Sequence, residues 1–342
     1  MILADRLAQC RTALRVPDPA SGRQIELSGA ASFAQRVSDC PLRFVLTDDL
    51  TRLCAELAYS KGAREVACAD LLHVPAEKLW IEWCNAPWQS ALKEYGFAAE
   101  DQGTASSGRR GALIYSSRDG RRGTIRTFWS IEGESGALAS SMEAYFDFDT
   151  PDGEDPSPPD DRLADGTCVY DGVRSRQDIL GRCFRFRYER SWAEYYSRGG
   201  LSAVEKQTIL RHVLGTIAFD VPLLLAFLLL LASRAGLPRL VRTYGALNRA
   251  RLKADRAPLL EHVEVRAPLL PAYVAHAGSD APGLRRHPRL HHVRGHIVRR
   301  GSQLFWRVPH LRGSVRSGVL RTRTVIWTFD NPAAGVSKTA AG

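Results

Sequence analysis

Apolar residues recur with helical spacing over residues 48–61. They occupy positions i, i+3, i+4, i+7 and i+8, which is the pattern of one buried helix face: Leu50, Leu53, Cys54, Leu57 and Ala58. Thr47 or Asp48 can cap the first turn, and Gly62 suits the end of a helix. The pattern predicts one amphipathic helix.

Aromatic and β-branched residues alternate in several short runs and predict strands at 79–83, 112–116, 124–131 and 142–149. The second and third runs flank Asp119-Gly120, a dipeptide that favours a hairpin turn because it tolerates positive φ. Three tryptophans within nine residues are interpreted as core side chains, since tryptophan mainly supplies buried area. Residues 1–149 therefore read as one mixed α+β domain.

Residues 150–165 contain six acidic residues and four prolines and predict a solvated linker. After it, Phe184–Tyr188 alternates aromatics with arginines, which predicts a strand with a core-facing aromatic row and a solvated arginine row. Ser202-Ala-Val-Glu205 is a capping box that opens a helix. Residues 239–256 predict a basic helix, and residues 259–265 a strand.

The stretch from 213 to 232 is very apolar and invites a membrane span. Asp220 and Pro222 interrupt it, and only about a dozen residues follow without a polar side chain, whereas a span needs about 20. We therefore expect a central buried helix within the segment 166–282, and no membrane partner.

Charge is concentrated near the C-terminus. Between Asp280 and Asp330 the chain has 11 arginines, no lysine and no acidic residue; because the net charge is +10, the rest sums to about −1. Such a run fits a polyanionic partner. Alternation within it predicts strands at 291–299, 303–308 and 322–329, which would form a small antiparallel β module over 283–329, followed by a tail at 330–342.

Arginine pairs bidentately with phosphate, histidine can donate to it, and aromatics can stack on bases. The candidate nucleic-acid-binding residues are therefore the arginines and histidines of this run: Arg285, Arg286, Arg289, His292, Arg294, His296, Arg299, Arg300, Arg307, His310 and Arg312.

Histidine spacing raises the question of a metal. Seven of the nine histidines follow residue 261, and His292 and His296 stand four apart. Gly295 and the β-branched neighbours favour a strand, on which these two would lie roughly 13 Å apart. One ion cannot bridge that distance, so we assign no metal site and no cofactor.

Seven cysteines without a Cys-x-x-Cys pair predict free thiols in a reducing compartment. The first residues lack a signal-peptide pattern, so a cytoplasmic location is expected. No Gly-rich phosphate loop, Ser-His-Asp order or carboxylate pair at helical spacing stands out. No reaction is therefore assigned, although a site built from distant residues stays possible.

One motif resembles a known group of proteins. The pattern His292-Val-Arg294-Gly-His296, then Trp306-x-x-Pro309-His310-x-Arg312-Gly313, is similar to the C-terminus of uncharacterised phage and prophage proteins. Residues 247–259 and 79–83 are similar to further segments of that family. The resemblance implies an accessory role in a phage or mobile element and brings no known activity.

These observations predict an α+β protein with a mixed N-terminal domain, a central apolar helical segment and a small antiparallel β module. The expected function is nucleic-acid binding by that module. Two other functions fit the same residues. One is a protein-interaction or virion-associated component that docks an acidic protein partner, and the other is a histidine-based, metal-dependent nuclease.

Overall fold

The structure is a computed structural model. It describes residues 2–18, 21–59, 69–94, 107–131, 137–151, 167–168, 183–198, 202–233, 237–268, 289–293, 296–301, 303–307, 310–312 and 314–319. The chain divides into two compact units. The first comprises Met1–Leu269 with His296–Arg307, and the second comprises Leu270–Gly295 with Val308–Gly342.

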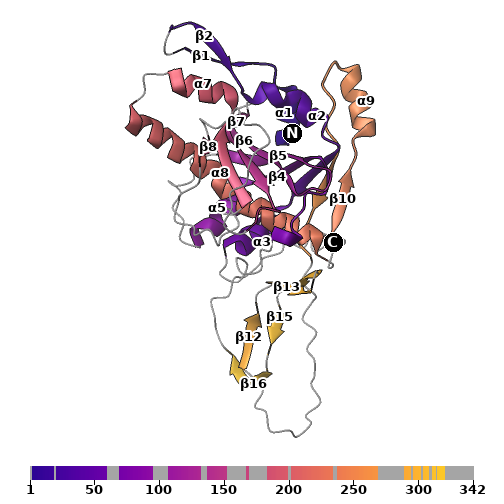
Figure 1. Cartoon of the computed structure of the whole chain (residues 1–342). Helices are drawn as coiled ribbons and strands as arrows, with labels where there is room; N and C mark the ends of the chain where they lie inside the picture. Colours follow the sequence, from indigo (N-terminus) through magenta and orange to yellow (C-terminus); the bar gives the residue numbers. More distant parts are fainter. Residues whose placement is uncertain are drawn as a thin grey trace, which may run out of the picture. The chain divides into compact units, whose positions relative to one another are not determined.

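A nine-stranded mixed sheet forms the centre of the first unit, in the order β10-β11-β3-β4-β5-β6-β7-β9-β8 (Figure 1). Strands β11, β3 and β4 run parallel to one another, and the remaining neighbours are antiparallel. The predicted α+β class is confirmed. The strands are β3 (Leu42–Leu46), β4 (Lys78–Cys84), β5 (Ser107–Ser116), β6 (Arg122–Ile131), β7 (Leu138–Asp147), β8 (Thr167–Cys168), β9 (Phe184–Tyr188), β10 (Arg239–Arg242) and β11 (His262–Val265).

This sheet crosses the predicted domain boundaries. Strands β9 and β11 come from residues 166–282, yet they pair with β7 and β3 from residues 1–149. The structure thus differs from the predicted division into separate domains at 149 and 166. Local hydrophobic patterns predict where strands occur. They do not predict which strands pair when the partners are more than 200 residues apart. The predicted linker lies largely outside the described residues.

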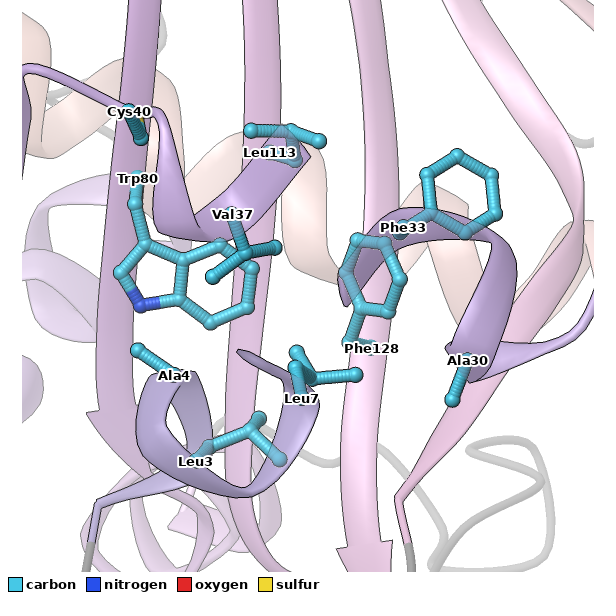
Figure 2. Close-up of a cluster of buried hydrophobic side chains, with 10 residues drawn as sticks. All are labelled: Leu3, Ala4, Leu7, Ala30, Phe33, Val37, Cys40, Trp80, Leu113 and Phe128. Atoms are coloured by element: carbon cyan, nitrogen blue, oxygen red, sulfur yellow. The ribbon is translucent and has the colours of Figure 1, made fainter. Parts of the chain in front are cut away.

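One face of the sheet is covered by short N-terminal elements: α1 (Leu3–Gln9), η1 (Ala30–Phe33) and α2 (Ala34–Ser38). Figure 2 shows Leu3, Leu7 and Val37 from these helices lying over Trp80 and Leu113 of the sheet. All five side chains are fully buried. A hairpin of β1 (Leu14–Pro17) and β2 (Gln24–Leu27) follows α1, and α7 (Arg190–Arg198) is tied to Ser28 through Trp192.

The opposite face is covered by α3 (Asp48–Tyr59), α5 (Asn85–Glu94) and α8 (Ala203–Ala232). Helices α3 and α8 lie against each other, and Phe227 of α8 meets Phe44 of β3 edge to face at 5.5 Å. The predicted amphipathic helix is confirmed as α3, and the predicted Ser202 capping box opens α8. Trp80, Trp83 and Trp88 are fully buried, as predicted.

Helix α8 contains the apolar stretch from the sequence. Val213–Ala232 is long and apolar enough to cross a membrane, but 78% of its most apolar window is buried inside the protein. That burial fits the core helix of a soluble protein. Its one acidic residue in this stretch, Asp220, forms a fully buried ion pair with Arg110 of β5, with Nη2 and Oδ2 3.1 Å apart.

The predicted hairpin is confirmed as β5 and β6. Its turn places Gly120 at φ +71°, where L side chains are strained. The carbonyl of Gly120 accepts a hydrogen bond from the Val74 amide at 2.9 Å. A β-carbon on Gly120 would lie only 2.2 Å from the Val74 carbonyl oxygen, so the turn and the 72–76 segment require glycine here.

Gly120→Ala is therefore expected to lower the free energy of unfolding by about 2 kcal/mol or more, from backbone strain and the clash. The matched control is Gly22→Ala, because Gly22 has φ +68° with nothing within 4 Å of its β-carbon position. Urea unfolding of both variants separates the two contributions. Equal losses of unfolding free energy in the two variants would show that the structure relieves the clash with Val74 without an energetic penalty.

Strand β9 corrects one prediction. Its aromatics are buried as expected, but Arg185 and Arg187 are also buried, at 4% and 9% exposure, so the expected solvated arginine row is wrong. Arg187 is neutralised by Glu143 of β7, with Nε–Oε1 and Nη2–Oε1 distances of 2.8 and 2.7 Å. The carboxylate comes from a cross-strand neighbour, which a single strand's pattern does not reveal.

Residues 239–256 differ as well. The predicted single basic helix is instead strand β10 followed by helix α9 (Gly245–Lys253). Strand β10 pairs with β11 through a register that matches Arg239 to Val265 and Arg242 to His262. The β-branched Val241 within Arg-Leu-Val-Arg suits this edge position.

Candidate nucleic-acid interface

A short hairpin in the first unit carries part of the predicted basic run. Strands β13 (His296–Arg300) and β14 (Gln303–Arg307) pair antiparallel, from His296 opposite Arg307 to Arg300 opposite Gln303. The turn begins at Gly301, whose φ of +59° favours glycine. The sequence predicted this turn and the strand after it, whereas the strand predicted before the turn began at residue 291.

The register gives the hairpin two different faces, because directly opposed residues share a face and successive residues alternate. Leu304 is 4% exposed, and β14 contacts α8. The face with Leu304 therefore rests on the protein. Arg300, Phe305 and Arg307 belong to the other face, on which both arginines are exposed and Phe305 is half-buried.

Neighbouring arginines on this hairpin have different electrostatic roles. The Arg299 guanidinium pairs bidentately with the Asp70 carboxylate, with Nη2–Oδ2 and Nη1–Oδ1 distances of 2.7 and 3.3 Å. Its Nε also donates to the Gly301 carbonyl at 2.9 Å. This pair ties the hairpin to η2 (Ala69–Leu71). Arg299 is therefore engaged within the protein.

Arg300 and Arg307 are not neutralised in this way. Within the part of the chain that the structure describes, neither has a carboxylate partner. The Arg300 guanidinium carbon lies 5.9 Å from the centroid of the Phe305 ring, a cation–π distance. The outer face of the hairpin thus carries two exposed guanidinium groups beside a half-buried aromatic ring.

The second unit holds a three-stranded sheet in the order β15-β12-β16 (Figure 1). Its strands are β12 (Arg289–Val293), β15 (His310–Arg312) and β16 (Ser314–Val319). The pairing places His291 opposite Arg312 and Val293 opposite His310. Positions 289, 291, 310 and 312 therefore share one face of this sheet. Strand β16 runs parallel to β12.

The predicted β module is thus divided. The expected single strand 291–299 is two strands, β12 and β13, which belong to different compact units. The expected antiparallel pairing is confirmed for β12 with β15 and for β13 with β14, whereas β16, which was not predicted, pairs parallel with β12. Because glycine is compatible with both extended and turned backbone, the sequence around Gly295 does not show whether one strand continues or two strands form. The predicted strand 322–329 and the tail 330–342 lie outside the described residues.

The structure places the predicted site residues in three groups. Three of them lie outside the described residues: Arg285, Arg286 and Arg294. Those in the three-stranded sheet of the second unit are Arg289, His292, His310 and Arg312. Those on the hairpin of the first unit are His296, Arg299, Arg300 and Arg307. The hairpin places Arg300 and Arg307 on one face, at opposite ends of the paired strands, and Arg299 on the other face.

The arrangement of these residues does not form a metal site. His292 and His296 lie on different strands in different units, so the i, i+4 spacing does not describe one helix face or one strand. In the described ranges no group of three or more histidine, cysteine, aspartate or glutamate side chains is arranged to hold a metal ion.

A second basic surface of the first unit lies on the edge of the large sheet. Arg239, Arg249, Lys253 and Arg256 are exposed and have no carboxylate partner among the described residues. Helix α9, which supplies two of them, has no buried residue. The sequence showed this charge but assigned Arg239 to a helix.

The chemistry available to both surfaces is the pairing of free guanidinium and ammonium groups with anions. Comparison of the chain with protein-family models, with curated proteins and with solved structures gives no match.

Proposed function

We propose that this chain binds nucleic acid through the outer face of the β13–β14 hairpin. The observation that carries the proposal is the pair of exposed arginines, Arg300 and Arg307, which lack a carboxylate partner in the described structure and flank Phe305. Guanidinium groups neutralise phosphates, and an adjacent aromatic ring can stack on a base. Arg299 on the inner face has a structural role instead.

The proposed setting is an accessory role in a phage or mobile element, supported by the motif that includes His296, Trp306, His310 and Arg312. A cytoplasmic location is proposed with it. The free cysteines support this location: Cys40, Cys54 and Cys183 are buried thiols, and Cys10 and Cys84 are half-buried ones. Thiols persist in a reducing compartment.

The test is a fluorescence-anisotropy titration of a labelled 30-mer, single-stranded and duplex, at several salt concentrations between 50 and 200 mM. Each phosphate contact contributes about −0.9 for duplex DNA, or about −0.7 for single strands, to the slope of log K against log salt. We expect Arg300→Gln/Arg307→Gln to weaken binding by about tenfold per arginine near 0.1 M salt and to flatten the slope by nearly two for duplex.

The control removes the same charge elsewhere. Arg23→Gln/Arg118→Gln replaces two exposed arginines in the β1–β2 and β5–β6 connections, and we expect it to change affinity by less than about threefold. If both double variants weaken binding equally, net charge and not the hairpin is responsible. If neither does, the proposal is wrong, and retained affinity for an acidic protein would then favour the docking alternative.

A further inference from the structure

The edge of the large sheet holds a pocket that the proposed function does not use. Helix α8 ends at Ala232, while the sheet continues beyond β3 through β11 to β10. The pocket lies where this helix stops covering the sheet. Its lining comes from all four elements, including Phe44, Leu228, Val241 and Val263, together with the 73–75 segment.

The lining is almost wholly apolar. Its two polar members are Arg239 of β10 and His73, and both are exposed. Arg239 shares a strand face with Val241, two positions along β10, so its side chain starts on the pocket side of the sheet. The acid on the neighbouring strand, Glu264, is paired with Arg242, with Oε2 and Nη2 2.7 Å apart.

The two faces of β10 therefore differ in whether their arginine is paired with a carboxylate. Leu240 lies opposite Glu264 in the ladder, and therefore Leu240, Arg242 and Glu264 share the face away from the pocket. There the positive charge is already neutralised. On the pocket face Arg239 has no carboxylate partner among the described residues, so an anion is the complementary group.

The volume of the pocket gives the scale of a ligand that would fill it. The pocket measures about 330 Å³, near the lower end of the range for small-molecule sites. At roughly 30 Å³ per non-hydrogen atom, taken from the volume share of a liquid water molecule, it holds roughly a dozen atoms. That is the size of a ten-carbon chain with a carboxylate.

We infer that this pocket binds an amphipathic carboxylate, with the apolar body between α8 and β3–β11–β10 and the carboxylate on the Arg239 guanidinium. His73 is the second hydrogen-bonding side chain in the lining of this pocket. None of the lining residues belongs to the hairpin, so the pocket ligand and any nucleic acid are tested with different variants.

The test is isothermal titration of the full chain with decanoate, decanol and decyltrimethylammonium, each below its micellar concentration. We expect saturable one-to-one binding of decanoate that is about tenfold or more tighter than that of decanol, since a hydrogen bond to a charged group contributes that much. The cationic analogue should bind most weakly. Arg239→Gln should remove the preference for decanoate and leave decanol within about twofold.

A matched pair of substitutions on one strand completes the test. Val241 and Leu240 are both exposed, at 64% and 41%, so glutamate is tolerated at either position. Val241→Glu should abolish decanoate binding, whereas Leu240→Glu, on the other face, should leave it within about twofold. No saturable binding by the wild type, no preference for decanoate over decanol, or equal loss in the two glutamate variants would overturn the inference.

Discussion

Asp220→Ala is expected to lower the free energy of unfolding by about 3–5 kcal/mol, a large share of the roughly 5–15 kcal/mol that is typical of a folded protein. The substitution leaves Arg110 fully buried without its carboxylate. The Arg110 guanidinium is also held 4.8 Å from the centroid of the Trp88 ring, so it has little room to turn toward solvent. Chemical unfolding followed by circular dichroism measures the loss.

The composition of α8 explains what the ion pair adds to the packing of this helix. Residues Leu223–Leu231 are apolar all round the helix, and nearly all of them are buried. Such a helix has no preferred rotation about its own axis on hydrophobic grounds. Asp220 distinguishes one orientation, because only there does its carboxylate meet Arg110. Burial raises the pKa of Asp220 to about 7, and the Arg110 guanidinium opposes that shift.

The double variant Arg110→Met/Asp220→Leu is the control for this prediction. Replacing a buried ion pair by apolar side chains of similar volume is often neutral or stabilising, so it should recover most of the stability that Asp220→Ala loses. A loss below about 1 kcal/mol for Asp220→Ala would mean that Arg110 finds other partners. A double variant as unstable as the single one would point to lost packing instead of an uncompensated charge.

The fold was predictable from sequence where one element carries its own signal. Helix α3, strand β4 and the Gly120 hairpin all have local apolar periodicity or turn chemistry. Prediction failed where a partner distant in sequence decides the outcome. Arg187 is buried because Glu143 stands beside it, and Arg239 is in a strand because β11 supplies the ladder.

The candidate site shows the same division. The concentration of arginines identified the C-terminal run from sequence. The same pattern did not distinguish one arginine from the next. Arg299 and Arg300 differ only in which face of β13 they occupy, and Asp70, more than 200 residues away, neutralises the first and not the second. The distinction between a structural and an available arginine therefore required the register of β13 against β14 and its packing on α8.

Glu82→Ala is expected to release the N-terminal helix from the sheet. Glu82 is fully buried in the middle of β4, and its two carboxylate oxygens accept hydrogen bonds from the Leu3 and Ala4 amides at 2.9 and 3.0 Å. The Trp80 indole donates at 3.3 Å, and Arg109 forms an ion pair with the same carboxylate. One side chain thus satisfies the start of α1 and anchors it to the sheet.

Removing that carboxylate leaves two amides, an indole and a guanidinium without their acceptor under the helix. Each buried unsatisfied group costs about 1–3 kcal/mol, so a total loss of about 3 kcal/mol or more is expected. Hydrogen exchange should show the amides of residues 3–9 losing protection first, since Leu3 and Leu7 pack on Trp80 only while α1 is docked. Glu26→Ala, at an exposed position of β2, is the matched control. Protection of α1 that survives Glu82→Ala unchanged would show that apolar burial alone holds this helix.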